Sequence, residues 1–281
     1  MNFLARCDAV IIDLRNNGGG DETMVRFLAS YFFRNPTQIN ALYFTETDSL
    51  EQSWTTAYVP GRKLIDTDLY ILTSNRTASG AEAFSYGMKH AGRAIIIGKN
   101  TSGAAHWTEY WDYPTIQIRA SIPIARPINP VTKTSWEGTG VTPDIDIEDE
   151  KALAVAHREA LKKIIKRTSD EQQKKDLEWD MVTVESQIEP VNLSLEDMET
   201  YTGEYDDGQR AILIKDHALY WRYVDGTEYI MIPLTRDLFG FDDTDYYRIG
   251  IVRDDSGNVT GHRILARDGD VGSIKKRTGD I

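Results

Sequence analysis

The chain has 281 residues, of which 41% are hydrophobic and 27% are charged, and its formal net charge is −12. This is the composition of an ordinary globular protein, which excludes disordered and fibrous classes, and the length predicts two domains. The negative charge, without a lysine and arginine stripe, excludes nucleic acid as the expected partner. No apolar run approaches the roughly 20 residues of a membrane-spanning helix. The single cysteine, Cys7, excludes an intrachain disulfide and a cysteine-based zinc site.

The first 150 residues alternate between short apolar runs and amphipathic segments. Apolar runs of this kind are typical of strands buried on both faces, and strand-helix alternation predicts an α/β layer with parallel strands. A further stretch, 115–124, alternates with period two and predicts a half-exposed strand, either an ordinary sheet member or an edge that accepts an extended peptide. The predicted parallel strands cover 10–14, 68–73 and 94–97, and the predicted helices cover 23–33 and 82–90.

The second half has a different pattern. Between 148 and about 185, apolar residues recur three and four apart among many charges, which predicts helices. Beyond Pro190, short strand candidates separated by turn signals predict a small all-β domain. We therefore predict a 1–150 α/β domain, a 151–190 helical connection and a 191–281 antiparallel β domain.

Three glycines, Gly18 to Gly20, follow the first predicted strand. Glycine tolerates positive φ and leaves backbone N–H groups uncovered, and the following helix adds the positive end of its dipole. The run is therefore either an anion-binding backbone segment or a tight turn before a helix capped by Asp21. It does not match a phosphate-binding loop, because no Gly-Lys-Ser/Thr follows.

Ser79 lies at the next strand-to-helix junction, between two small residues, where it is a candidate nucleophile. The amides of Gly80 and of a glycine in the 18–20 run are candidate donors to the oxyanion of an acyl-transfer reaction. The alternative reading is a Ser-x-x-Glu capping box with Glu82, which would hold the hydroxyl on its own helix.

Four ordered blocks of sequence resemble the tail-specific, or C-terminal-processing, serine proteases. They are Ile-Asp-Leu-Arg-Asn-Asn-Gly-Gly-Gly at 12–20, Thr-Ala-Ser-Gly-Ala-Glu at 77–82, Gly-Lys-Asn-Thr-Ser-Gly at 98–103 and Trp-Glu-Gly-Thr-Gly-Val-Thr-Pro-Asp at 136–144. The resemblance covers roughly residues 8 to 147. It implies a ClpP/crotonase-like parallel-sheet core, with Ser79 as nucleophile and the amides of Gly19 and Gly80 as oxyanion donors.

The general base is where the resemblance departs from the family pattern. One branch uses a Ser-Lys dyad, but its lysine position reads Ala104 here. The fourth block resembles the branch of the tricorn core protease and the interphotoreceptor retinoid-binding protein, whose glutamate matches Glu137. That branch takes its histidine from a segment upstream of the first block. We therefore expect an N-terminally truncated family member with a core incomplete at its N-terminus.

Other candidates for the base lie within the chain itself. His106 follows the Gly103 turn next to the expected site, and it is either a substitute base, a substrate ligand or a surface residue. Lys99 and Lys89 are weaker candidates. Asp13 and Arg15 lie on one face of their strand, which an ion pair explains.

The leading functional hypothesis is a serine peptidase that cleaves a peptide or protein substrate through an acyl-enzyme on Ser79, with no metal or organic cofactor. The alternative is a non-catalytic protein of the same fold that binds an apolar ligand or a peptide. A third hypothesis, a crotonase-like acyl-CoA enzyme, is disfavoured by the 136–144 block. The resemblance also implies an intact parent protein in the periplasm or outside the cell.

Overall fold

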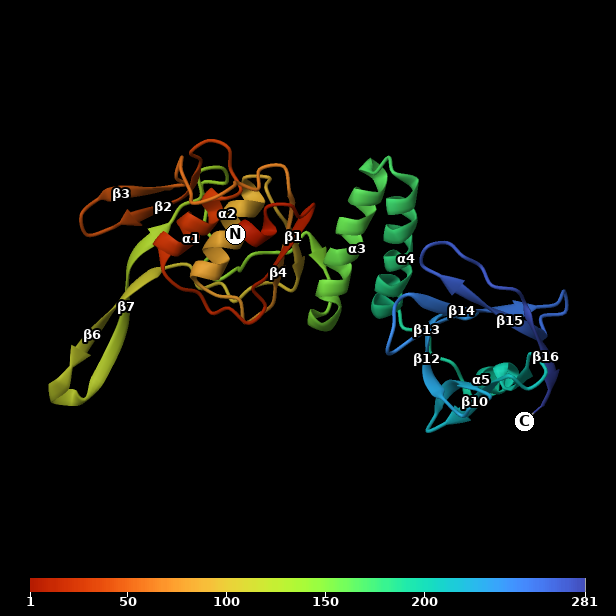
Figure 1. The fold of residues 1–281 in the computed structure, drawn as a ribbon. Helices are drawn as coiled ribbons and strands as arrows, with labels where there is room; N and C mark the ends of the chain where they lie inside the picture. The colour runs from red at the N-terminus through yellow and green to blue at the C-terminus, as the bar shows by residue number, and fades with distance from the viewer. Residues whose placement is uncertain (281) are drawn as a thin grey trace. The chain divides into compact units, whose positions relative to one another are not determined.

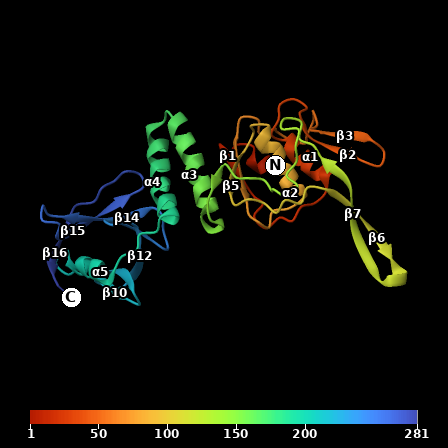
Figure 2. The same cartoon turned by 180° about the vertical axis from the view of Figure 1, so that it is seen from behind.

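The computed structural model describes residues 1–280. The chain divides after Ala160 into two compact units (Figures 1 and 2). Each unit has its own hydrophobic core.

A four-stranded parallel sheet lies at the centre of the first unit. Its order is β1 (Ala9–Asp13), β4 (Asp68–Thr73), β5 (Ile95–Gly98) and β8 (Ile145–Asp146). The first three strands are the predicted ones. The apolar runs of β4 and β5 are buried, whereas that of β1, at the edge of the sheet, is only partly buried. The predicted α/β fold with a parallel sheet is therefore confirmed.

Two helices follow the first two parallel strands, as predicted. Helix α1 spans Glu22–Ser30 and helix α2 spans Gly80–His90. Phe84 and Met88 of α2 join Ile71 and Ile96 of the sheet in one core. Because each helix begins directly after a strand end, both helix N-termini lie at the same edge of the sheet.

A second, antiparallel sheet was only partly predicted. Its order is β3 (Ser49–Trp54), β2 (Gln38–Phe44), β7 (Ile118–Pro127) and β6 (Trp107–Tyr113). The hairpin of β6 and β7 projects from the rest of its unit (Figure 1). The predicted strand begins at Ile118 instead of 115, because Pro114–Ile116 form a 3-10 turn and Gln117 adopts φ 53°.

Of the two alternatives for the 115–124 stretch, the structure supports the ordinary sheet member and not the peptide-accepting edge. Strand β7 pairs with β2 on one side and with β6 on the other, so it is an ordinary member of the sheet. The outer strand is β6, which is exposed along its whole length.

Three helices lead into the barrel of the second unit. Helix α3 spans Asp149–Arg167, α4 spans Glu171–Ile188 and α5 spans Leu195–Tyr201. The first two fill the region that was predicted to be helical. The short α5, which was not predicted, begins at a capping box of Ser194 and Asp197.

The remaining strands form a closed antiparallel barrel, which confirms the predicted all-β region and adds its closure. In β11, the buried Leu219 and Trp221 alternate with the less buried Tyr220 and Arg222, as expected for a barrel strand. The strands are β9 (Gly203–Tyr205), β10 (Arg210–Lys215), β11 (Ala218–Tyr223), β12 (Glu228–Thr235), β13 (Leu238–Phe241), β14 (Tyr247–Arg253), β15 (Val259–Ala266) and β16 (Lys275–Gly279).

Candidate active site

The two strand-to-helix junctions of the first unit meet. A Cβ placed on Gly19 would lie 2.7 Å from Ser79 Cβ and 2.9 Å from the Gly80 nitrogen. One placed on Gly80 would lie 2.9 Å from the Gly20 nitrogen. The Ala78 N–H also donates to the Asn17 carbonyl at 3.1 Å. The glycine run is therefore needed for close backbone approach, because any side chain at Gly19 would collide with the serine turn.

Ser79 differs from the other residues that precede helices in this chain. Asp21, Asp170 and Ser194 have extended backbones, and their side chains accept hydrogen bonds from the first turn. Ser79 instead has φ 53° and ψ −119°, which is not an extended backbone. Positive φ at a residue with a side chain is strained, and such strain concentrates at functional sites. Ser79 also forms the predicted capping box with Glu82, in which the Ser79 N–H donates to Glu82 Oε2 at 2.8 Å.

Glu82 joins the serine turn to the next loop of the site. Its carboxylate is fully buried. Besides the Ser79 amide, it accepts hydrogen bonds from the hydroxyl of Thr101 at 2.5 Å and the amides of Gly103 at 2.7 Å and Ala104 at 2.9 Å. Sequence analysis considered Glu82 only as a capping residue, but the structure gives it a second role as the buried anchor of the 101–104 loop.

The candidate oxyanion donors differ in whether their N–H groups are already hydrogen-bonded. The Gly19 N–H donates to Asn17 Oδ1 at 2.9 Å, so it is already engaged. Within residues 1–280, the N–H groups of Gly20 and Gly80 donate no hydrogen bond. Both of these glycines line the cavity beside Ser79. Of the two donors expected by resemblance, Gly80 is therefore open, whereas in the glycine run the open amide belongs to Gly20.

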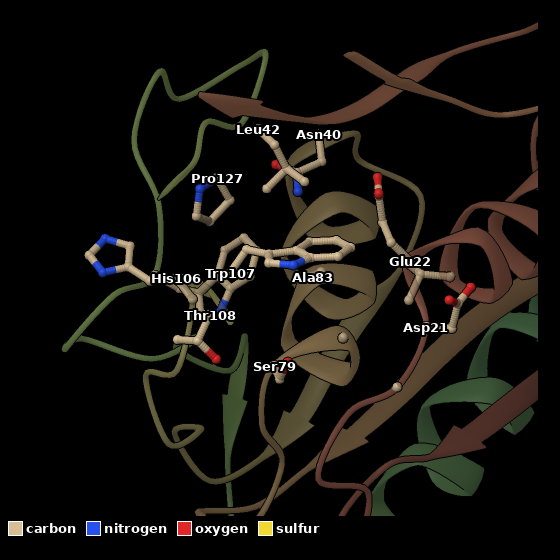
Figure 3. Close-up of a pocket in the computed structure, with 15 residues that line it drawn as sticks. Asp21, Glu22, Asn40, Leu42, Ser79, Ala83, His106, Trp107, Thr108 and Pro127 are labelled. Atoms are coloured by element: carbon tan, nitrogen blue, oxygen red, sulfur yellow. The ribbon is translucent and has the colours of Figure 1, made fainter. Parts of the chain in front are cut away.

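A cavity of about 250 Å³ opens beside Ser79 (Figure 3). The start of α1, strand β2, the start of α2, the loop before β6 and the end of β7 all contribute to its wall. Its lining residues are Gly20, Asp21, Glu22, Val25, Asn40, Leu42, Ser79, Gly80, Ala83, Ala105, His106, Trp107, Thr108, Pro127 and Trp136.

The structure brings His106 and Glu137 together. Glu137 Oε2 accepts hydrogen bonds from the amides of Ala105 at 2.7 Å and His106 at 2.9 Å, and Glu137 Oε1 lies 3.6 Å from His106 Nδ1. The imidazole is turned away from Ser79 (Figure 3), and no hydrogen bond joins Ser79 Oγ to any imidazole of residues 1–280. Glu137 and His106 are therefore neighbours, while the serine and the histidine do not meet.

The lysine alternatives are engaged elsewhere. Lys99 Nζ pairs with Asp146 at 3.1 Å and Glu148 at 2.7 Å. Lys89 Nζ pairs with Asp144 at 2.9 Å. Neither ammonium is placed at Ser79, so neither supports a Ser-Lys dyad.

Two orphaned polar atoms belong to residues that line the cavity. Asn40 Oδ1 and Trp136 Nε1 are buried and have no hydrogen-bond partner within residues 1–280. Buried polar atoms normally have partners, so an unpaired acceptor and donor beside one cavity indicate a polar ligand or ordered water there. Sequence analysis assigned no role to either residue.

Acidic side chains stand at the α1 side of the cavity. Burial raises the pKa of the Glu22 carboxyl above its usual value, with the neighbouring Asp21 adding to the effect and Arg26 opposing it. The Ser53 hydroxyl donates to Glu22 Oε1. No lysine or arginine lines this cavity, so its wall carries negative but no positive side chains.

Three further observations concern an ion pair, possible metal ligands and membrane-spanning helices. Asp13 and Arg15 form the expected ion pair at 2.6 Å. Across residues 1–280, no cluster of three histidine, cysteine or acidic side chains is arranged to hold a metal ion. No helix in this range is long and apolar enough to cross a membrane.

Comparison with known proteins places this site in a family. The model of peptidase family S41 matches residues 2–147, which is more than half of the chain. The chain therefore belongs to peptidase family S41, and the family expected from the four sequence blocks is confirmed.

Solved structures with similar folds include three proteases or peptidases. The photosystem II D1 C-terminal processing protease is 20% identical, with a TM-score of 0.43 over 51% of this chain and 35% of its own. A putative peptidase from Parabacteroides merdae is 20% identical, with a TM-score of 0.44 over 50% and 45%. Mature CPAF is 15% identical, with a TM-score of 0.46 over 53% and 41%. The match thus spans less than half the length of each of these structures.

Proposed function

We propose that the first unit is a serine peptidase unit in which Ser79 is the nucleophile. The observation that carries the proposal is the Ser79 turn, whose strained residue lies against the glycine run and lines the cavity. Ser79 Oγ attacks the carbonyl carbon of a peptide bond, the amine leaves, and water hydrolyses the resulting ester. The N–H groups of Gly80 and Gly20 donate to the oxyanion that forms during each attack.

The cavity wall supports a peptide as substrate. A peptide main chain offers alternating N–H donors and C=O acceptors. Asn40 Oδ1 is an unpaired acceptor and Trp136 Nε1 is an unpaired donor, so together they complement one such pair. The carboxylates of Asp21 and Glu22, without a neighbouring cation in the lining, favour a basic side chain in the cavity.

His106 is the base that we propose within the described residues. Rotation of its side chain toward the cavity would let the imidazole take the Ser79 proton and later give it to the leaving amine. Glu137 is the positioning residue, since it holds the backbone of Ala105 and His106 and lies 3.6 Å from Nδ1. Family membership also leads us to propose an exported parent protein.

A fluorophosphonate probe tests the nucleophile directly. We expect covalent labelling of the protein at Ser79, identified by mass spectrometry of the peptides, and loss of the label in Ser79→Ala. Ser102→Ala is the matched control, because Ser102 is an exposed serine in the adjacent loop. Labelling that persists in Ser79→Ala, or none in the wild type, would contradict the proposal.

One observation favours a second function, binding without catalysis. Ser79 Oγ lacks a hydrogen bond to a basic nitrogen within residues 1–280, and an unactivated serine is a weak nucleophile. A non-catalytic protein would use the same cavity to hold a peptide or an apolar ligand. It would bind substrate-like peptides equally well in the wild type and in Ser79→Ala, and it would release no cleavage product in either.

A further inference from the structure

The closed barrel of the second unit contains a cavity that the peptidase chemistry does not use. Its volume is about 460 Å³, within the usual range for small-molecule sites. An eight-stranded barrel is wide enough either to be filled by side chains or to hold one small ligand. Its lining residues are Trp221, Tyr223, Tyr229, Phe241, Asp243, Thr244, Tyr247 and Ile264.

The cavity lies at one end of the barrel, and helix α5 packs at the other. Met198 and Tyr201 of α5 belong to the barrel core, where the Tyr201 ring packs on Phe239 near the start of β13. The cavity residues lie instead where β11 and β13 end and where β12 and β14 begin. Because antiparallel strands alternate in direction, these positions share the end opposite to α5.

The middle of the barrel holds polar atoms that no protein group satisfies. Trp221 Nε1 and both ring nitrogens of His262 are buried without a hydrogen-bond partner within residues 1–280. The two rings lie 6.1 Å apart between centroids, and Trp221 lines the cavity. Such a donor next to an open volume indicates a guest that carries an acceptor.

The charge around the cavity is asymmetric. Asp243 lines it, and no salt bridge joins this carboxylate to another residue of 1–280, whereas Asp245 pairs with Arg267 at 2.9 Å. The guanidinium of Arg210 lies 4.2 Å from the centroid of the Tyr223 ring. Arg210 is not part of the lining, so Asp243 is the charged side chain that a guest would meet.

We propose that this cavity binds a small aromatic amine. The side chains of Trp221, Tyr223, Tyr229, Phe241 and Tyr247 enclose the aromatic ring of the amine. Its ammonium group pairs with Asp243 at the mouth of the cavity, and a hydroxyl group on its ring accepts a hydrogen bond from Trp221 Nε1. The site is independent of the Ser79 chemistry, and its guest enters without covalent change.

Tyramine is the probe for this site, and binding is measured on the full chain by calorimetry and by tryptophan fluorescence. We expect saturable binding with one site per chain. The analogue 3-(4-hydroxyphenyl)propionate, which carries a carboxylate in place of the ammonium, is expected to bind about tenfold more weakly or less, the effect of losing a charge-assisted bond.

Two variants locate the site. Asp243→Asn removes the charge from an exposed position and is expected to weaken tyramine binding about tenfold. Ile264→Phe fills the cavity and is expected to abolish binding while the barrel remains folded by circular dichroism. Asp255→Asn, in the exposed turn between β14 and β15 at the opposite end, is the matched control and keeps wild-type affinity.

Several outcomes would overturn the proposal. They are the absence of tyramine binding at millimolar concentration, equal binding of the carboxylate analogue, or unchanged affinity in both cavity variants. If tyramine does not bind, the orphaned nitrogens are satisfied by water alone.

Discussion

At Gly19, one methyl group is enough to disturb the candidate site. The residue has φ 113°, and an added Cβ would lie 2.7 Å from Ser79 Cβ and 2.9 Å from the Gly80 nitrogen. We expect Gly19→Ala to lower the free energy of unfolding by about 1 to 3 kcal/mol, the usual range for local backbone strain, and to abolish fluorophosphonate labelling. Chemical denaturation and the labelling assay measure the two effects.

Gly18 provides the matched control in the same glycine run. A Cβ on Gly18 would meet no atom within 4 Å, and its φ is not positive. Gly18→Ala should therefore change the free energy of unfolding by no more than about 0.5 kcal/mol. Equal losses in both variants would mean that the run has no special contact with the serine turn.

Glu82 should be costly to remove because its carboxylate satisfies several buried donors. Glu82→Ala leaves the Thr101 hydroxyl and the amides of Gly103 and Ala104 without their acceptor. An unsatisfied buried donor costs about 1 to 3 kcal/mol, so we expect a loss of at least about 2 kcal/mol in urea unfolding. Glu51→Ala, on an exposed position of β3, should change stability by less than about 0.5 kcal/mol, and a similarly small effect at Glu82 would refute its anchoring role.

At the scale of elements, the projecting hairpin of β6 and β7 combines aromatic side chains with exposure. Trp111 is 52% exposed on β6, whereas Trp136 is 2% exposed beside the cavity. Trp111→Ala should shift the free energy of unfolding by less than about 0.5 kcal/mol. Trp136→Ala should cost about 3 to 5 kcal/mol, as truncations of buried tryptophan do. Thermal unfolding of the pair measures the contrast, and a large cost at Trp111 would show that the hairpin packs against something in solution.

The parallel-sheet elements were predictable from sequence, and several antiparallel ones were not. Buried parallel strands are continuous apolar runs, so β1, β4 and β5 stand out. Strand β6 reads Trp-Thr-Glu-Tyr-Trp-Asp-Tyr and is exposed on both faces, so it has no inside-outside alternation to detect. Strands β2 and β3 were missed as well, because their cross-strand partners, not their own pattern, define them.

The residues of the candidate site were also predictable from sequence only in part. Ser79 and the glycine run belong to local motifs, so sequence alone identified them. Asn40 enters from β2, far along the chain, and its exposure to the cavity depends on tertiary packing that no local pattern encodes. The position of His106 relative to Ser79 is a matter of side-chain rotation, which spacing along the chain does not determine.

At the scale of the whole molecule, acid should act on the barrel through His262. Burial lowers the pKa of this fully buried histidine from 6.5 to about 4, so its charged form is disfavoured in the folded state. The unfolded chain then binds more protons between pH 6.5 and 4, and stability falls as the pH drops through that window. The difference between the two pKa values of His262 corresponds to a loss of about 3 kcal/mol in the free energy of unfolding.

His262→Phe removes this titration. Its free energy of unfolding should therefore decline less than that of the wild type between pH 6.5 and 4, measured by denaturant titration at each pH. His157→Gln, at an exposed position of α3, is the control and should keep the wild-type pH dependence. Parallel pH profiles for the wild type and His262→Phe would contradict the assignment.

Closure of the barrel has a consequence for how copies of this chain can associate. In a closed barrel, every strand has a neighbour on both sides, so no strand edge offers unpaired N–H and C=O groups to another molecule. The open antiparallel sheet ends instead at β3 and β6, and Tyr110 and Trp111 on β6 expose apolar rings. Misassembly under stress should therefore start in the first unit, and a lysine introduced on β6 should be the most effective single change for keeping concentrated protein in solution.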